Sequence, residues 1–279
     1  MAMMIGLVPA LFWGVLPVWI RKFAKGNARQ QLLGTTIGIA VVAAGLTLVL
    51  HLRVDLVSAG LFFLSGFCWS FGQGGQYESY ERLGVSTTMP LSTALQIIGN
   101  SVIGGLVFGE WQGVQDVLLS ILALAVLIVG VLLTNGRMHS TGRLVDYLLL
   151  VGSTVGYWGY SALPHYAHVS SNLNGFLPQA LGMLAAALAI SMTHPQEIKQ
   201  MGMVRNISSG LIFSVAAATY LVSLSMNGLV NAFVLSQMNV IVATLLGGIV
   251  LHEFAHGQGT RTAAGLVVLL VGATWLVTI

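Results

Sequence analysis

GGLVFGE, from Gly104 to Glu110, returns 143 residues later as GGIVLHE, from Gly247 to Glu253, with the double glycine and the glutamate at the same spacing. Three more segments of the first half are repeated in the same order, at offsets between 142 and 150 residues. They pair Phe12-Trp13-Gly14 with Tyr157-Trp158-Gly159, SAGLFF (58–63) with SSGLIF (208–213), and AVLIVG (125–130) with VVLLVG (267–272). Echoes in one order at a nearly constant offset indicate an internal repeat. The sequence therefore predicts two homologous halves, residues 1–140 and 141–279.

The composition is that of a membrane protein. Hydrophobic residues make up 56% of the chain and charged residues only 7%, and the mean hydropathy is +0.87, far outside the range of soluble globular chains. A helix needs about 20 apolar residues to cross hydrocarbon. Ten such stretches fit the chain, at about 2–20, 32–52, 57–77, 87–109, 117–135, 144–163, 173–193, 207–226, 229–252 and 261–279. We predict an all-α membrane protein with ten transmembrane helices.

Basic residues are distributed unevenly over the connections between these stretches. Ten of the eleven Lys and Arg residues lie in the odd-numbered connections, and only Arg53 lies in an even-numbered one. Because basic residues are retained on the cytoplasmic side, both termini are expected to be extracellular, in the plasma membrane. No basic cluster stands on a polar face, so we expect no nucleic-acid partner.

Five helices per half is an odd number, so the second half is expected to thread the membrane in the opposite direction from the first. Inverted repeats of this kind are typical of secondary transporters, which hold their substrate near the bilayer midplane between the repeats. The prediction is therefore two inverted five-helix repeats forming a transporter, not an enzyme. The fifth and tenth stretches are almost purely aliphatic, which suits contact with lipid or with a second copy of the chain in a homodimer.

Amides within the predicted helices are candidate substrate contacts. Gln73 and Gln76 lie on one face of the third stretch, and Gln96 and Asn100 share a face of the fourth. Amides donate and accept hydrogen bonds at once and aromatic rings offer flat apolar faces, so both kinds of side chain suit a neutral polar substrate. The candidates are Trp13, Trp69, Gln73, Gln76, Gln96, Asn100, Tyr157, Trp158, Gln237 and Asn239. The alternative is that the amides only tie helices together.

The repeat favours the functional interpretation of the amides, because Gln96 maps onto Asn239 at the offset of 143. Gln237 lies two residues before Asn239, about 160° around the same predicted helix, so only one of the two is expected to face a cavity. Trp13 and Trp158 are equivalent in the repeat and either stack on a sugar or pack against neighbours. Weaker candidates are Tyr160, Gln179 and Tyr220.

Proton coupling needs a group that changes charge between states, and carboxylates are the usual means inside membranes. All eight acidic residues fall at or beyond the ends of predicted helices. Glu110 and Glu253 are the candidates for proton coupling because both halves keep them. The alternative role is to cap or pair with a neighbouring element, so uncoupled facilitation stays open.

His252-Glu253-Phe254-Ala255-His256 matches the H-E-x-x-H pattern of zinc proteases. A catalytic zinc needs a third protein ligand, yet residues 257–279 contain no His, Asp, Glu or Cys. The first half keeps the glutamate as Glu110 but has glycines in place of both histidines. A membrane metalloprotease is therefore only a remote alternative, and we expect no metal site and no cofactor.

Three motifs carry a resemblance to a known family: Gly72-Gln73-Gly74-Gly75-Gln76, then Gly84-Val85-Ser86-Thr87-Thr88-Met89-Pro90 leading to Gln96, and Gly109-Glu110-Trp111. The chain resembles the bacterial glucose/ribose uptake proteins, a ten-helix branch of the drug/metabolite transporter superfamily, over its whole length and most clearly over residues 58–111. The resemblance implies import of a monosaccharide, glucose or ribose, with proton symport. It also implies a cavity lined mainly by helices 1, 3, 4, 6, 8 and 9. Export or facilitated passage of another small neutral metabolite is the alternative.

Overall fold

The computed structural model describes residues 2–83, 85–134, 143–250 and 259–279, and within them it contains helices and no strands. The prediction of an all-α protein is confirmed. The helical elements are α1 (Ala2–Trp19), η1 (Ile20–Ala24), α2 (Ala28–Leu50), α3 (Leu56–Leu83), α4 (Val85–Val102), η2 (Ile103–Val107), α5 (Val114–Thr134), α6 (Leu144–Ala162), η3 (Leu163–Tyr166), η4 (Asn172–Gly175), α7 (Phe176–Met192), η5 (Pro195–Glu197), α8 (Gln200–Gln237), α9 (Asn239–Val250) and α10 (Gly259–Thr278).

Six of the described segments are both long enough and apolar enough to cross a membrane. They are Ala2–Ala24, Ala28–Leu50, Leu56–Ser79, Val114–Leu133, Asn172–Met192 and Gln200–Ala243. The last segment has 44 residues, about twice the length that one crossing requires. Leu91–Val107 and Thr260–Leu276 are shorter apolar helices. The chain therefore has multiple spans, while the number of ten crossings stays a prediction.

Residue Gly228 interrupts the long helix α8. Its φ of 74° and ψ of 176° are not helical, and glycine adopts a positive φ without steric penalty. The sequence predicts a gap between stretches at this point, and the chain bends there. A second interruption at Met238 separates α8 from α9, so the predicted single stretch 229–252 is divided between two helices.

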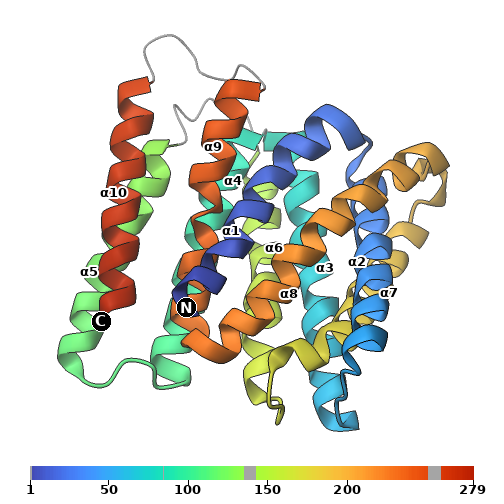
Figure 1. Ribbon diagram of the computed structural model, residues 1–279. Coiled ribbons are helices and arrows are strands. Elements are labelled where there is room, and N and C mark those ends of the chain that lie inside the picture. Colours follow the sequence, from blue (N-terminus) through green and yellow to red (C-terminus); the bar gives the residue numbers. More distant parts are fainter. Residues whose placement is uncertain (1, 84, 135–142, 251–258) are drawn as a thin grey trace.

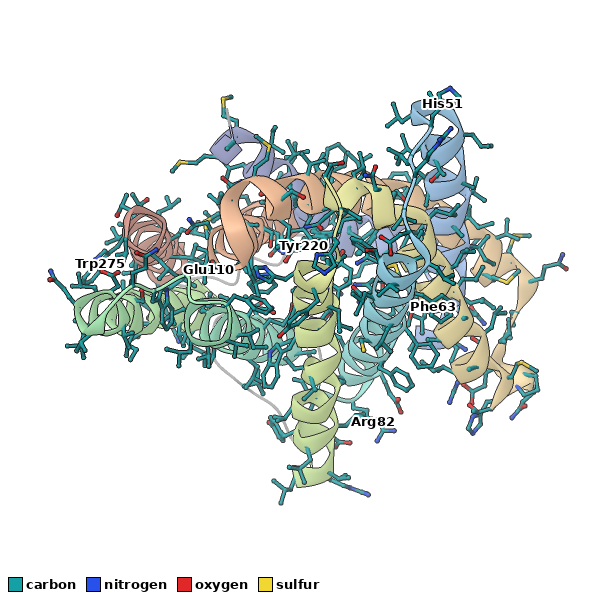
Figure 2. The ribbon with its side chains drawn as sticks, turned by 90° about the horizontal axis from the view of Figure 1, so that it is seen from below. His51, Phe63, Arg82, Glu110, Tyr220 and Trp275 are labelled. Carbon is teal, nitrogen blue, oxygen red and sulfur yellow. The ribbon has the colours of Figure 1, made fainter. Side chains whose placement is uncertain are left out.

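The helices form two groups and a separate pair (Figure 1). In the first group, α8 packs against α1 and α2, and α9 packs against α1. In the second group, α3 packs against α6 and α7, and α4 packs against α6. Helices α5 and α10 stand side by side at one edge of the molecule, and α2 contacts α7 at the other. Seen from below (Figure 2), Tyr220 lies near the middle of the bundle, between Glu110 and Phe63.

Glycines allow the helix backbones to touch within each group. A Cβ added to Gly66 of α3 would lie 1.8 Å from a backbone carbonyl oxygen of α7, and one added to Gly182 of α7 would lie 1.9 Å from a carbonyl oxygen of α3. In the other group, a Cβ on Gly210 of α8 would lie 2.2 Å from a carbonyl oxygen of α2, and Gly38 of α2 is equally crowded by α8. Small residues permit such close packing in membranes, where dispersion forces and hydrogen bonds hold helices together.

We expect Gly66→Ala to lower the free energy of unfolding by about 1–3 kcal/mol, because the added methyl group forces α3 and α7 apart. The matched control is Gly60→Ala in the same helix, where nothing lies within 4 Å of the added Cβ. This control should leave stability unchanged or raise it by up to about 1 kcal/mol through helix propensity. Thermal unfolding in detergent measures both variants, and equal midpoints for the two would contradict the close contact.

Candidate substrate site

A buried network of amides and hydroxyls begins where α3 meets α6. Gln73 and Gln76 are one helical turn apart in α3 and therefore share a face. The Tyr157 hydroxyl, from α6, donates a hydrogen bond to Oε1 of Gln76 at 2.6 Å and lies 3.1 Å from Oε1 of Gln73. Nε2 of Gln73 in turn lies 3.4 Å from Oε1 of Gln76. Three of the predicted site residues thus meet in one cluster.

The network continues into α4. Nε2 of Gln76 donates to the Ser92 hydroxyl at 3.1 Å, and Nε2 of Gln96 donates to the same hydroxyl at 3.0 Å. All of these side chains are buried. The bonds tie α3, α4 and α6 together through neutral groups that both donate and accept hydrogen bonds.

Other predicted residues have buried polar atoms with no hydrogen-bond partner among the described residues. These atoms are both amide atoms of Asn100, Oδ1 of Asn239 and Nε1 of Trp13. A buried polar group without a partner costs free energy, so these atoms are available to a polar ligand or to water. Gln237 is also buried. Gln237 ends α8 and Asn239 begins α9, and the expectation that only one of the two faces a cavity stays a prediction.

A row of aromatic rings crosses from one helix group to the other. The centroids of Trp69 and Phe213 are 4.8 Å apart, and Trp13 lies 5.6 Å from Phe213 and 5.5 Å from Tyr220. Tyr160 of α6 stacks on Tyr220 of α8 at 6.0 Å, with 17° between the ring planes. Phe213 was not among the predicted site residues. The repeat offered the signal, because Phe213 follows Trp69 by 144 residues, and Tyr220 follows Gln76 by the same number.

Trp158 differs from its predicted equivalent Trp13 in having a hydrogen-bonded indole. Its Nε1 donates to the backbone oxygen of Leu95 at 3.1 Å. Its ring covers Gly99, where an added Cβ would lie 2.0 Å from the indole. Trp158 therefore packs α6 against α4. Of the two roles considered for it, stacking on a sugar or packing against neighbours, this is packing.

Glu110 caps the helix that restarts after the break in α8. The backbone N–H groups of Leu229 and Val230 donate to its two carboxylate oxygens at 2.7 and 2.9 Å. Those groups are otherwise unsatisfied because Gly228 interrupts the helix. The predicted partner Glu253, with His252 and His256 of the zinc-protease pattern, lies outside the described residues.

Comparisons with known proteins identify the family of the chain. A family model described as "Sugar transport protein" matches residues 4–279. The chain belongs to this family of sugar transport proteins. A "Putative sugar uptake protein" of Lactiplantibacillus plantarum is 37% identical, covering 98% of each chain. A "Putative ribose uptake protein RbsU" of Latilactobacillus sakei is 36% identical over 97% of this chain and 96% of its own.

A "Putative ribose uptake protein RbsU" of Staphylococcus epidermidis is 35% identical over 98% of this chain and 97% of its own. A solved structure, titled "Crystal structure of protein", has a TM-score of 0.73 over 97% of both chains, at 15% identity. That likeness shows a shared fold. The family consists of transporters, so this sugar transport protein is a multi-pass membrane transporter and not an enzyme.

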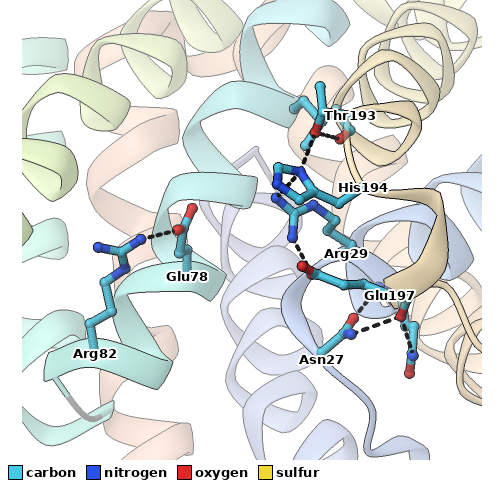
Figure 3. Close-up of polar contacts among 9 residues, drawn as sticks. Asn27, Arg29, Glu78, Arg82, Thr193, His194 and Glu197 are labelled. Carbon is cyan, nitrogen blue, oxygen red and sulfur yellow. Dashed lines mark hydrogen bonds and ion pairs between the residues drawn. The ribbon is translucent and has the colours of Figure 1, made fainter.

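Among the described residues, two ion pairs join residues 1–140 to residues 141–279 of this sugar transport protein. Arg29 pairs with Glu197 (Figure 3), and its guanidinium also donates to Nδ1 of His194 at 3.0 Å. Asn27 and Gln30 donate to the backbone oxygen of Glu197 at 2.9 and 2.8 Å. The connection between α7 and α8 is thereby fastened to the start of α2, on the side where the basic residues predict the cytoplasm.

Arg82 forms the second ion pair between the halves. It bonds Asp146 at the start of α6, at 3.1 Å, and also pairs with Glu78 one turn earlier in α3 (Figure 3). The backbone N–H of Arg143 and the Arg82 guanidinium both donate hydrogen bonds to the carboxylate of Asp146. These bonds fix the start of α6 beside the end of α3.

We expect Glu110→Ala to lower the free energy of unfolding by about 1–3 kcal/mol, because two backbone N–H groups lose their acceptors. Glu110→Gln keeps one acceptor oxygen and should lose less. Thermal unfolding in detergent ranks the stability of the two variants against that of the wild type. If Glu110→Ala is as stable as the wild type, the cap at the break does not support the fold.

Proposed function

We propose that the chain is a secondary transporter that imports a monosaccharide, glucose or ribose, across a bacterial plasma membrane. The observation that carries the proposal is the neutral, buried set of amides and hydroxyls on α3, α4 and α6, beside the row of aromatic rings. Neutral groups that donate and accept, next to aromatic faces, fit a polyol better than an ion. The names of the relatives, sugar and ribose uptake proteins, point to the same substrate class.

The proposed architecture is ten crossings in two inverted repeats, with both termini extracellular. Equivalent contacts that each half makes with the other support this architecture. A Cβ on Gly210 would meet the carbonyl oxygen of Thr35, and a Cβ on Gly66 would meet that of Gln179. Gly66 and Gly210 are 144 residues apart, as are Thr35 and Gln179. The same contact is thus made twice with the roles of the halves reversed, as a twofold axis between them requires.

Helices α5 and α10 show the same reciprocity. A Cβ on Gly130 would lie 2.5 Å from the backbone nitrogen of Leu269, and one on Gly272 would lie 2.7 Å from that of Leu127. Both pairs are related by an offset of 142 residues. Large apolar side chains remain exposed on both helices, which suits lipid or a second copy of the chain.

Gln73→Ala and Gln96→Ala should each reduce uptake of labelled glucose or ribose by about 5- to 100-fold, the value of one or two lost hydrogen bonds. The reduction should appear as a higher KM, with the amount of protein in the membrane unchanged. The matched control is Gln115→Ala, an exposed glutamine of α5, which should transport normally. Unchanged uptake in both site variants would show that these two amides do not bind the substrate.

Proton symport is the coupling that the family resemblance implies, with Glu110 and Glu253 as candidate carriers. Uncoupled facilitation is the second candidate function, favoured by one observation: both carboxylate oxygens of Glu110 already accept backbone N–H groups. A neutral carboxyl would face one of those donors with its own O–H, so protonation disturbs the cap.

Proteoliposomes separate the two modes of coupling. Under symport, an imposed gradient with the interior alkaline should drive accumulation of sugar above its external concentration, and Glu110→Gln should abolish accumulation while sparing equilibration. Equilibration without accumulation in the wild type would establish facilitation. The same vesicles, loaded with sugar and with the gradient reversed, test the alternative of export.

A further inference from the structure

Two tyrosine hydroxyls at one end of the aromatic row are buried without hydrogen bonds. Tyr160 is 4% exposed and Tyr220 is 1% exposed. Neither hydroxyl makes a hydrogen bond with the part of the chain that the structure describes. Ser161, next to Tyr160 in α6, also has a buried hydroxyl oxygen that makes no hydrogen bond with the described residues. Three hydroxyls thus gather at the contact of α6 with α8.

Buried tyrosine hydroxyls usually find a partner, and leaving one unpaired in an apolar interior costs free energy. Phenylalanine would give the same ring packing at both positions without that cost. Two such hydroxyls on stacked rings therefore need an explanation, because the packing described gives them no hydrogen-bond partner. Binding of a ligand with its own hydroxyls would supply it.

These hydroxyls continue the amide network toward one end of α6. Tyr157 and Tyr160 are three residues apart in α6 and lie on one face, and Tyr157 bonds Gln76 at the other end of the strip. The amides of Gln73, Gln76 and Gln96 donate to one another or to Ser92, whereas the hydroxyls of Tyr160 and Tyr220 make no hydrogen bond with the described residues. The polar groups along this face of α6 therefore fall into two sets. The amides bond one another, and the hydroxyls of Tyr160 and Tyr220 are available to a ligand.

We propose that the hydroxyls of Tyr160 and Tyr220 hydrogen-bond a specific pair of sugar hydroxyls and determine which monosaccharide is accepted. This inference rests on the proposed function, since the ligand is a polyol in both. α6 and α8 belong to different helix groups, so relative movement of the groups changes the space between the two rings. In the arrangement described, the rings stack on each other at 6.0 Å.

The proposal predicts opposite effects of Tyr220→Phe on sugar affinity and on stability. Removing the hydroxyl should raise KM for the transported sugar by about three- to tenfold, the value of one neutral hydrogen bond. It should leave the unfolding temperature in detergent without sugar unchanged or higher, because an unpaired buried hydroxyl is removed. Tyr160→Phe should behave alike. The control is Tyr147→Phe, at the other end of α6, which should alter neither quantity.

Monodeoxy analogues of glucose and ribose identify the sugar hydroxyls concerned. The wild type should lose affinity for the analogue that lacks the hydroxyl bound by Tyr220. Tyr220→Phe should bind that analogue as tightly as it binds the full sugar, because the hydrogen bond is already missing. For the other analogues it should lose as much affinity as the wild type does, which is the result expected when two groups interact directly. Purely structural tyrosines would give additive losses for every analogue.

The inference is overturned if both phenylalanine variants discriminate among the analogues as the wild type does, or if their unfolding temperatures fall while KM is unchanged. In either case the wild type still transports sugar, and the proposed function stands. Failure of the wild type to transport any monosaccharide in proteoliposomes overturns the proposed function itself.

Discussion

The hydrocarbon core of the membrane offers no water to a polar group, and this constraint accounts for most of the structure. Backbone groups must bond within the protein, so the described residues form helices. Where a helix is broken at Gly228, the carboxylate of Glu110, from the connection between η2 and α5, replaces the missing partners of Leu229 and Val230. The same constraint makes every buried amide informative, because each must bond a neighbour, water or a ligand.

Helices in such a solvent associate through close contact, since lipid tails are as apolar as their side chains. Glycines at the crossings of α2 with α8 and of α3 with α7 bring backbones within reach of each other. These crossings hold each helix group together, while fewer contacts, among them those of α2 with α7, join one group to the other. Strong packing within groups and weaker packing between them is an arrangement that rigid-body movement can use.

The sequence predicted the helical architecture and part of the site, because those features depend on local periodicity. Gln73 and Gln76 had to share a helix face, and the structure pairs them. The partner of Glu110, the division at Met238 and the position of Phe213 depend on packing between segments that are far apart in the chain. Tyr160 and Tyr220 were ranked as weak candidates because nothing local to either residue shows that its hydroxyl lacks a partner.

Glu110 links the question of proton coupling to the shape of α8. Its carboxylate accepts the N–H groups of Leu229 and Val230 at the break and so fixes where the helix restarts after Gly228. Tyr220, beside the aromatic row, lies on the same helix before the break. Under the proposed symport, a proton bound by Glu110 acts on these two bonds and, through them, on the helix that carries part of the proposed sugar site.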